Sequence, residues 1–137
     1  MKANELRIGN YINNEQRTEF VRAVDNWRIQ CHLLTDKKQE TLYEVSIHLI
    51  KPIPLTEQWL VDFGFDKNIN KNQIDGIKMK LSIDNNKTIF SSCGTLDGGM
   101  VVLCLCAGNY FSNNLKYVHQ LQNLYFALTG KELKKIS

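Results

Sequence analysis

No stretch of this sequence approaches the uninterrupted run of about 18 to 20 apolar residues that a membrane-spanning helix needs. The first residues, Met1 to Glu5, lead into polar positions and not into the apolar segment of a secretory signal peptide. We therefore expect a soluble chain that is neither inserted in a membrane nor exported, and that resides in the cytoplasm.

The four cysteines lack the spacing of a disulfide framework. Three of them, Cys93, Cys104 and Cys106, lie in strand-like apolar surroundings, so we expect reduced, buried thiols. Cys104 and Cys106 point to the same side of a strand, whereas structural zinc is usually held by C-x₂₋₄-C pairs presented from turns. A zinc site would need Cys31 and His32 to complete it, which requires the two halves of the chain to close on each other.

The sequence also lacks any recognisable catalytic arrangement. His32, His48 and His119 are scattered, and none has a serine, cysteine or carboxylate at the spacing of a nucleophile and its base. The Gly98-Gly99 pair predicts a turn between strands and not a phosphate-binding loop before a helix. We expect a protein that is not an enzyme and that binds no cofactor.

The net charge of +3 is small for a nucleic-acid-binding protein, but its distribution is uneven. Residues 1–64 hold eight basic and nine acidic side chains, whereas residues 65–137 hold nine and five. Two interpretations stay open: the basic side chains keep the protein soluble and protect a sheet edge, or they attract an acidic or RNA-bearing partner. The residues of this basic group are Lys67, Lys71, Lys78, Lys80 and Lys87.

The first 53 residues predict a β-subdomain, because short apolar segments alternate with polar turns and no helical period competes. Four short strands with tight connections are typical of a small SH3-like barrel or curled sheet. The Asp25-Asn26 pair predicts a tight hairpin turn, since both residues tolerate positive φ angles. The predicted strands are Leu6–Ile12, Glu19–Asp25, Trp27–Leu34 and Leu42–Ile50.

Residues 54–66 predict a helical joint between two halves. Pro52 and Pro54 interrupt the strands before it, Thr56 can cap a short helix, and Gly64 is suited to the position after its end. We expect the apolar side chains of this segment to form the core of the joint: Trp59, Leu60, Phe63 and Phe65.

Residues 67–137 predict a polar loop at 67–73, an antiparallel meander and a final helix, which makes the whole chain an α+β protein packed as one compact unit. The predicted strands are Ile77–Ile83, Thr88–Cys93 and Met100–Cys106. The segment Leu115–Leu128 has its apolar residues in one helical stripe and is followed by Gly130. We expect this helix to cover the apolar face of the meander.

The side of the final helix opposite the apolar stripe carries His119, Gln122, Asn123 and Phe126. If the helix is buried on one side only, Phe126 is not needed for the core and is a candidate anchor for a partner. If the helix is buried on both sides, the same four residues belong to the interior. With the basic group, these residues are the candidate partner-binding site.

Three stretches resemble a family of small, mostly uncharacterised proteins encoded by Bacteroidetes, their phages and their prophages. They are the first ten residues, MKANELRIGN; the central segment PLTEQWL followed by FGF at 63–65; and the final segment YVHQLQNLYFALTG at 117–130. The last stretch is the most specific. The family brings no assigned active site, so no residue acquires a role from the resemblance.

The resemblance implies an accessory protein of a mobile genetic element. Phages of such hosts carry small non-enzymatic proteins that block host defences by binding the effector, CRISPR ribonucleoproteins among them. We therefore expect binding to a host protein or ribonucleoprotein, with RNA contact as one possibility and no membrane partner. The alternatives are a nucleic-acid-binding accessory factor and a small phage structural or housekeeping component.

Overall fold

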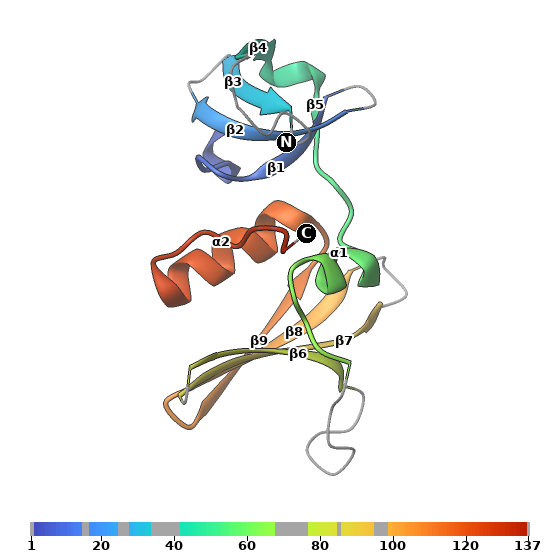
Figure 1. The fold of residues 1–137 in the computed structure, drawn as a ribbon, viewed down its shortest axis with the longest axis vertical. Coiled ribbons are helices and arrows are strands. Elements are labelled where there is room, and N and C mark those ends of the chain that lie inside the picture. The colour runs from blue at the N-terminus through green and yellow to red at the C-terminus, as the bar shows by residue number, and fades with distance from the viewer. Residues whose placement is uncertain are drawn as a thin grey trace. The chain divides into compact units, whose positions relative to one another are not determined.

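The computed structural model describes residues 2–14, 17–24, 28–33, 42–67, 77–84, 86–94 and 99–136. Within these residues the chain is an α+β protein with two antiparallel sheets and two α-helices, which confirms the predicted class (Figure 1). The chain divides into unit 1, Met1–Pro54 with Tyr117–Glu132, and unit 2, Leu55–Lys116 with Leu133–Ser137. None of the helices formed by the described residues is both long enough and apolar enough to cross a membrane.

The sheet of unit 1 has the strand order β4-β3-β2-β1-β5, and all of its pairs are antiparallel. The two edge strands, β4 and β5, are joined through the short 3₁₀ helix η2 and do not pair with each other, so the described residues form no closed barrel. The elements are η1 Ala3–Glu5, β1 Tyr11–Asn14, β2 Arg17–Val24, β3 Arg28–Leu33, β4 Tyr43–Ser46, η2 Ile47–Leu49 and β5 Ile50–Lys51.

The predicted first strand, Leu6–Ile12, begins later than expected. Residues 3–5 form η1, and Gly9 has a φ of +94°, a left-handed conformation that ends any extended run through this position. β1 therefore starts at Tyr11. The hairpin predicted at Asp25-Asn26 lies outside the described residues.

One face of this sheet packs into an apolar core. Alternate residues of β2 point to opposite faces, which places Val21 inside with the apolar side chains of β1, β3, β4 and β5. The core residues are Leu6, Ile12, Val21, Cys31, Val45, Ile47 and Ile50. Glu19 is two positions before Val21 and so shares its face, where its side chain is completely buried.

Unit 2 begins with the predicted short helix, α1, at Glu57–Asp62. The Thr56 hydroxyl accepts a hydrogen bond from the Trp59 N–H at 3.4 Å, as expected of an N-cap residue. Leu60, Phe63 and Phe65 are buried, whereas Trp59 is half-buried. Three of the four predicted core residues of this segment are therefore buried, and all four belong to unit 2.

The sheet of unit 2 has four strands in the order β6-β7-β8-β9. β6 spans Ile77–Asp84, β7 Lys87–Gly94, β8 Met100–Cys106 and β9 Asn109–Leu115. The bounds of β8 match the predicted strand, while β9 was not predicted. Its sequence NYFSNNL is rich in asparagine, which is depleted in strands, so pairing to β8 and not intrinsic propensity decides its conformation.

The final helix, α2, spans Val118–Thr129 and ends at Gly130, whose φ of +70° is the left-handed cap predicted for it. Leu115, the predicted first helical residue, instead ends β9. The helix belongs to unit 1 and the meander to unit 2, so the expected cover of the meander by α2 stays a prediction. The first N–H of α2, from Val118, donates to the Ile53 carbonyl at 2.9 Å within unit 1.

Candidate functional site

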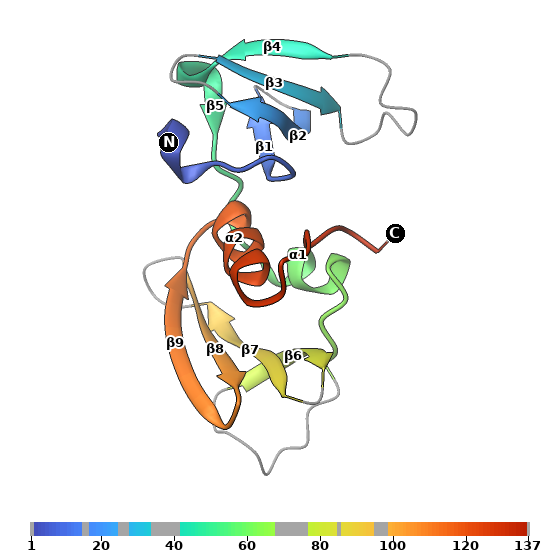
Figure 2. The same ribbon diagram turned by 90° about the vertical axis from the view of Figure 1, so that its left-hand side faces the viewer.

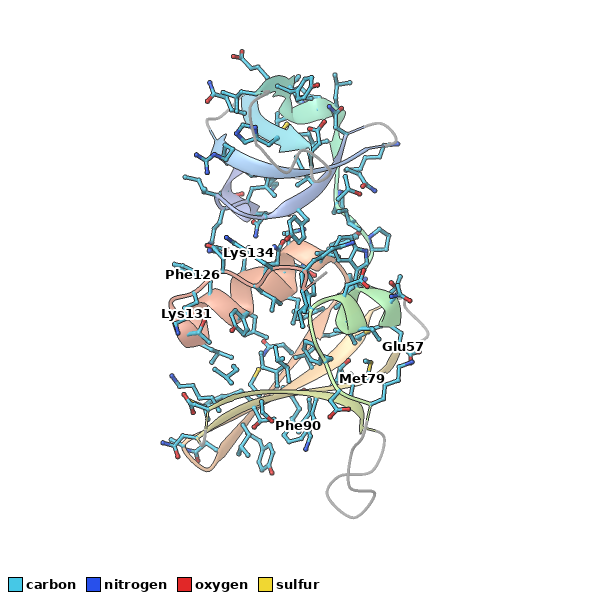
Figure 3. All side chains as sticks on the ribbon, in the orientation of Figure 1. Glu57, Met79, Phe90, Phe126, Lys131 and Lys134 are labelled. Carbon is cyan, nitrogen blue, oxygen red and sulfur yellow. The ribbon has the colours of Figure 1, made fainter. Side chains whose placement is uncertain are left out.

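Phe126, the predicted anchor, lies near the end of α2 and is 39% exposed (Figure 3). The guanidinium of Arg7 lies 3.8 Å from the centre of its ring. A guanidinium over an aromatic face stabilises the pair electrostatically and also fixes the orientation of the ring. The aromatic side chain is therefore exposed and held in place at the same time.

Arg7 is itself held by two further groups of unit 1. Its Nη1 donates to Oδ1 of Asn123 at 2.9 Å, and its Nη2 forms an ion pair with the carboxylate of Glu132. Asn123 Oδ1 also accepts from Nδ2 of Asn10, and its Nδ2 donates to the Glu5 carbonyl at 3.0 Å. The Asn123 amide therefore orients Arg7 and joins α2 to the N-terminal segment.

Gln122 has no exposed surface. Its Oε1 accepts from the N–H of Tyr11 at 2.8 Å and its Nε2 donates to the carbonyl of Gly9 at 3.1 Å. These bonds satisfy backbone groups at and just before the start of β1, which burial would otherwise leave unpaired. Gln122 is thus a structural residue of unit 1 and does not belong to a contact surface in this conformation.

His119 is also buried, with 2% of its surface exposed. Its ring stacks on that of Tyr117 with a centroid distance of 5.8 Å, and its Nδ1 has no hydrogen-bond partner among the described residues. Burial lowers the pKa of this imidazole, the Coulombic effect of Glu5 raises it, and that of the N-terminal amine lowers it. The neutral ring is favoured, as expected of an interior aromatic and not of a polar contact residue.

The predicted basic group belongs to unit 2, whereas the helix residues belong to unit 1. Lys67 is exposed and its Nζ lies 3.1 Å from Oε1 of Glu57. Lys80 and Lys87 are half-buried. Lys71 and the side chain of Lys78 lie outside the described residues. The lysines and the helix residues therefore lie in different units, and a joint surface of the two groups stays a prediction.

Two thiols of unit 2, those of Cys104 and Cys106, occupy different environments. Cys104 is buried, and burial followed by the Coulombic effect of Cys106 raises its pKa to about 11. Cys106 is half-buried. The described residues contain no group of three or more histidine, cysteine, aspartate or glutamate side chains arranged to hold a metal ion.

Two features of the surface were missed from the sequence. Arg7 and Asn123 are 116 positions apart, so no local spacing could have paired Arg7 with the end of α2. Lys131 is exposed just beyond the end of that helix, five residues after Phe126. We call the residues Phe126, Arg7, Asn123 and Lys131 the Phe126 surface.

The second missed feature is a pair of exposed aromatic residues on β9. Tyr110 is 54% exposed and Phe111 is 57% exposed. The sequence signal was present but unused: Ala107-Gly108 separates two apolar or aromatic segments as a two-residue hairpin loop does.

Comparison with models of protein families, with curated proteins and with solved structures found no match for this chain.

Proposed function

We propose that this protein acts by binding a host protein or ribonucleoprotein through the Phe126 surface, and that it catalyses no reaction itself. The observation that carries the proposal is the exposed Phe126 ring fixed by the Arg7 guanidinium at 3.8 Å. Aromatic and arginine side chains dominate the binding energy of protein interfaces. A ring that is already oriented loses little conformational entropy when a partner packs against it.

The charges near this ring favour a partner with acidic or phosphate groups. Lys131 is exposed, while Glu132 is already engaged by Arg7. A basic side chain beside an aromatic anchor steers an acidic partner toward it and raises the rate of encounter more than the final affinity. An RNA-bearing effector would supply such groups, and contact with RNA is part of the proposal.

The biological setting rests on the resemblance to small proteins of Bacteroidetes phages and prophages. We propose that the protein works in the cytoplasm of the bacterial host as an accessory factor of a mobile element, and that its target is a defence effector such as a CRISPR ribonucleoprotein.

The meander β4-β3-β2-β1-β5 with the η2 turn before its last strand supports an SH3-like architecture for unit 1. Domains of that architecture host many unrelated functions, so the Phe126 surface carries the functional argument.

The test is affinity capture from infected host cells with the tagged full chain, followed by mass spectrometry of the proteins retained. Phe126→Ala should lose at least about nine-tenths of the wild-type partner, because a central anchor contributes about 2 kcal/mol or more. Loss of the contact with Arg7 should cost only about 0.5 to 1 kcal/mol of folding stability. Thermal unfolding of the variant checks that the protein remains folded.

Val61→Ala is the matched control, because Val61 is an apolar side chain that is also 39% exposed but belongs to α1. It should retain the partner. Equal capture by wild type and Phe126→Ala would disprove the assignment of this surface. Capture that survives ribonuclease and falls only gradually with salt indicates a protein target, whereas a steep loss with salt indicates phosphate contacts.

A further inference from the structure

The strand β9 lies at one edge of the sheet of unit 2 (Figure 2). Among the described strands it pairs with β8 alone, in the register Cys106↔Asn109 to Met100↔Leu115. Among the described residues, no other segment bonds to the backbone of Tyr110, Ser112 or Asn114. As far as the described residues go, the outer side of this strand is therefore open to pairing with another strand.

The hairpin turn fixes which residues face outward. Ala107 and Gly108 have φ angles of 50° and 80°, the combination of a type I′ turn with a two-residue loop. The pair Cys106↔Asn109 that closes such a loop exchanges hydrogen bonds, and bonded pairs then recur at every second position. The N–H and C=O groups of the intervening residues consequently point away from β8; these residues are Tyr110, Ser112 and Asn114.

The opposite edge of the same sheet is protected in three ways that β9 lacks. β6 carries charged residues, its pairing with β7 has two register shifts, and Asp66 covers part of its free side through backbone bonds of 2.7 and 3.0 Å to Lys80. Charges, irregular register and covering segments are the devices that keep edge strands from pairing. The seven residues of β9 contain no charge and no proline, and their register is regular.

Most side chains of β9 are also exposed to solvent. Tyr110 and Phe111 point to opposite faces of the sheet, because successive strand residues alternate. Phe111 is opposite Cys104 in the register and so shares the face on which Cys104 and Val102 are buried, yet Phe111 remains 57% exposed. Tyr110 shares the other face with Phe90; Figure 3 shows Met79 and Phe90 on opposite sides of the sheet.

We propose that two copies of this chain associate by antiparallel pairing of β9 with β9, about a twofold axis through Ser112. Full overlap of Asn109–Leu115 with its copy places Ser112 opposite Ser112 and Tyr110 opposite Asn114. These are the outward-facing residues, so the register of greatest overlap is also one in which the backbone groups match, with about six new hydrogen bonds. The two four-stranded sheets become one continuous sheet.

The strand that pairs with β9 belongs to a second copy of this chain, because β9 can pair with its own copy without bringing like charges together. A strand that pairs with its own copy brings like charges together wherever a charged residue lies near the axis, and β9 has none. The two Phe111 rings become diagonal neighbours across the axis, about 7 to 8 Å apart at Cα and within reach of each other. Association thereby buries the more exposed of the two aromatic residues.

The experiment is sedimentation velocity on the purified full chain over a wide range of concentration. We expect a species of twice the 15.8 kDa chain mass that dissociates on dilution. Ser112→Lys places two ammonium groups at the axis without altering the β8 pairing, and should weaken association by at least about tenfold. Ser82→Lys is the matched control, since Ser82 is also an exposed serine of an edge strand but belongs to β6; it should dimerise like the wild type.

A measurement on the unaltered protein provides a second test. Hydrogen exchange of the amides of Tyr110, Ser112 and Asn114 should slow as concentration rises, because the dimer gives each a hydrogen-bond partner. A wild type that stays monomeric, or Ser112→Lys that dimerises as strongly as the wild type, would overturn the proposal. Phe126→Ala should leave the dimer mass unchanged, so failure of the dimer and failure of the proposed function are distinguishable.

Discussion

The thiol of Cys31 donates a hydrogen bond of 2.5 Å to Oε2 of Glu19, and neither side chain has any exposed surface. Nδ2 of Asn14 approaches the other carboxyl oxygen at 3.5 Å. A carboxyl group in an apolar core needs hydrogen-bond donors to offset its loss of water. The buried cysteine of β3 is therefore part of the solvation of Glu19 and not only a packing residue.

Cys31→Val keeps an apolar side chain of similar size but removes this donor. We expect it to lower the free energy of unfolding by about 1 to 3 kcal/mol, the cost of a buried polar group that loses a partner. Urea denaturation measures the change. Combining Cys31→Val with Glu19→Leu should recover most of the loss, because exchanging both partners for apolar groups can be nearly neutral. A double variant as unstable as the sum of the two single variants would contradict this coupling.

His119 should make the protein less stable in mild acid. Burial holds its folded pKa below the ordinary value of 6.5, so the folded state disfavours the protonated ring. The stability that the neutral His119 ring contributes is fully present above the pKa of this histidine in the unfolded state. It is lost as the pH falls from that value toward the pKa in the folded state. Glu5 opposes this loss and the N-terminal amine adds to it.

The test of His119 compares the free energy of unfolding at about pH 7 and about pH 5. The decrease should be smaller in His119→Gln than in the wild type, whatever the absolute stability of the variant. His48→Gln, at an exposed histidine of η2, should retain the wild-type decrease. If all three proteins lose stability equally, His119 is not the group that titrates.

The thiols of the described residues should differ in reactivity. Cys104 has a pKa of about 11 because of burial and the nearby Cys106, so its reactive thiolate is scarce near neutral pH. Iodoacetamide applied to the native protein should modify the half-buried Cys106 well before Cys104 or the buried Cys31, as read by peptide mass spectrometry. Equal labelling in urea serves as the control, and fast native labelling of Cys104 would show that β8 opens readily.

Trp59 and Phe63 should contribute unequally to the stability of unit 2. Trp59 is half-buried between the Phe63 ring at 5.5 Å and the Lys135 ammonium at 4.1 Å, whereas Phe63 is 2% exposed. Phe63→Ala should cost about 3 to 5 kcal/mol, and Trp59→Ala about half as much because part of its surface already faces water. Denaturant midpoints rank the stabilities of the two variants. A larger loss of stability in Trp59→Ala would mean that the contacts of Trp59 with Lys135 and Phe63 stabilise unit 2 more than the burial of Phe63 does.

Two C-terminal residues, Lys135 and Ile136, contact Asp62 of α1. Its Nζ lies 3.2 Å from Oδ2 of Asp62, and the Ile136 N–H donates to the Asp62 carbonyl at 2.9 Å. Hydrogen bonds from Gln58 and Lys135 hold the pKa of Asp62 below its ordinary value. The stability that these interactions of the Asp62 carboxylate contribute is present above its pKa in the unfolded state. It is lost as the pH falls through its pKa in the folded state, so Lys135→Met should reduce stability at neutral pH more than in strong acid.

The sequence predicted several elements because local chemistry decides them. Thr56 and Gly64 bound α1, Gly130 ends α2, and the apolar residues of Met100–Cys106 form β8 with the predicted bounds. Capping side chains and left-handed glycines act within a few residues of their own position, and alternating burial follows from strand geometry. Such features do not depend on where distant segments lie.

Tertiary structure alone decided the candidate surfaces. From the sequence, the amides of Gln122 and Asn123 are expected on the solvent-facing side of an amphipathic helix. In the structure, the Gln122 amide forms hydrogen bonds with the backbone of Gly9 and Tyr11, and the Asn123 amide accepts a hydrogen bond from Arg7. The strand β9 exists because β8 pairs with it, and its open edge follows from its place in the strand order. Apolar periodicity and capping residues determined the α+β class and the ends of its elements, whereas contacts between residues more than 100 positions apart determined which polar groups of α2 remain accessible.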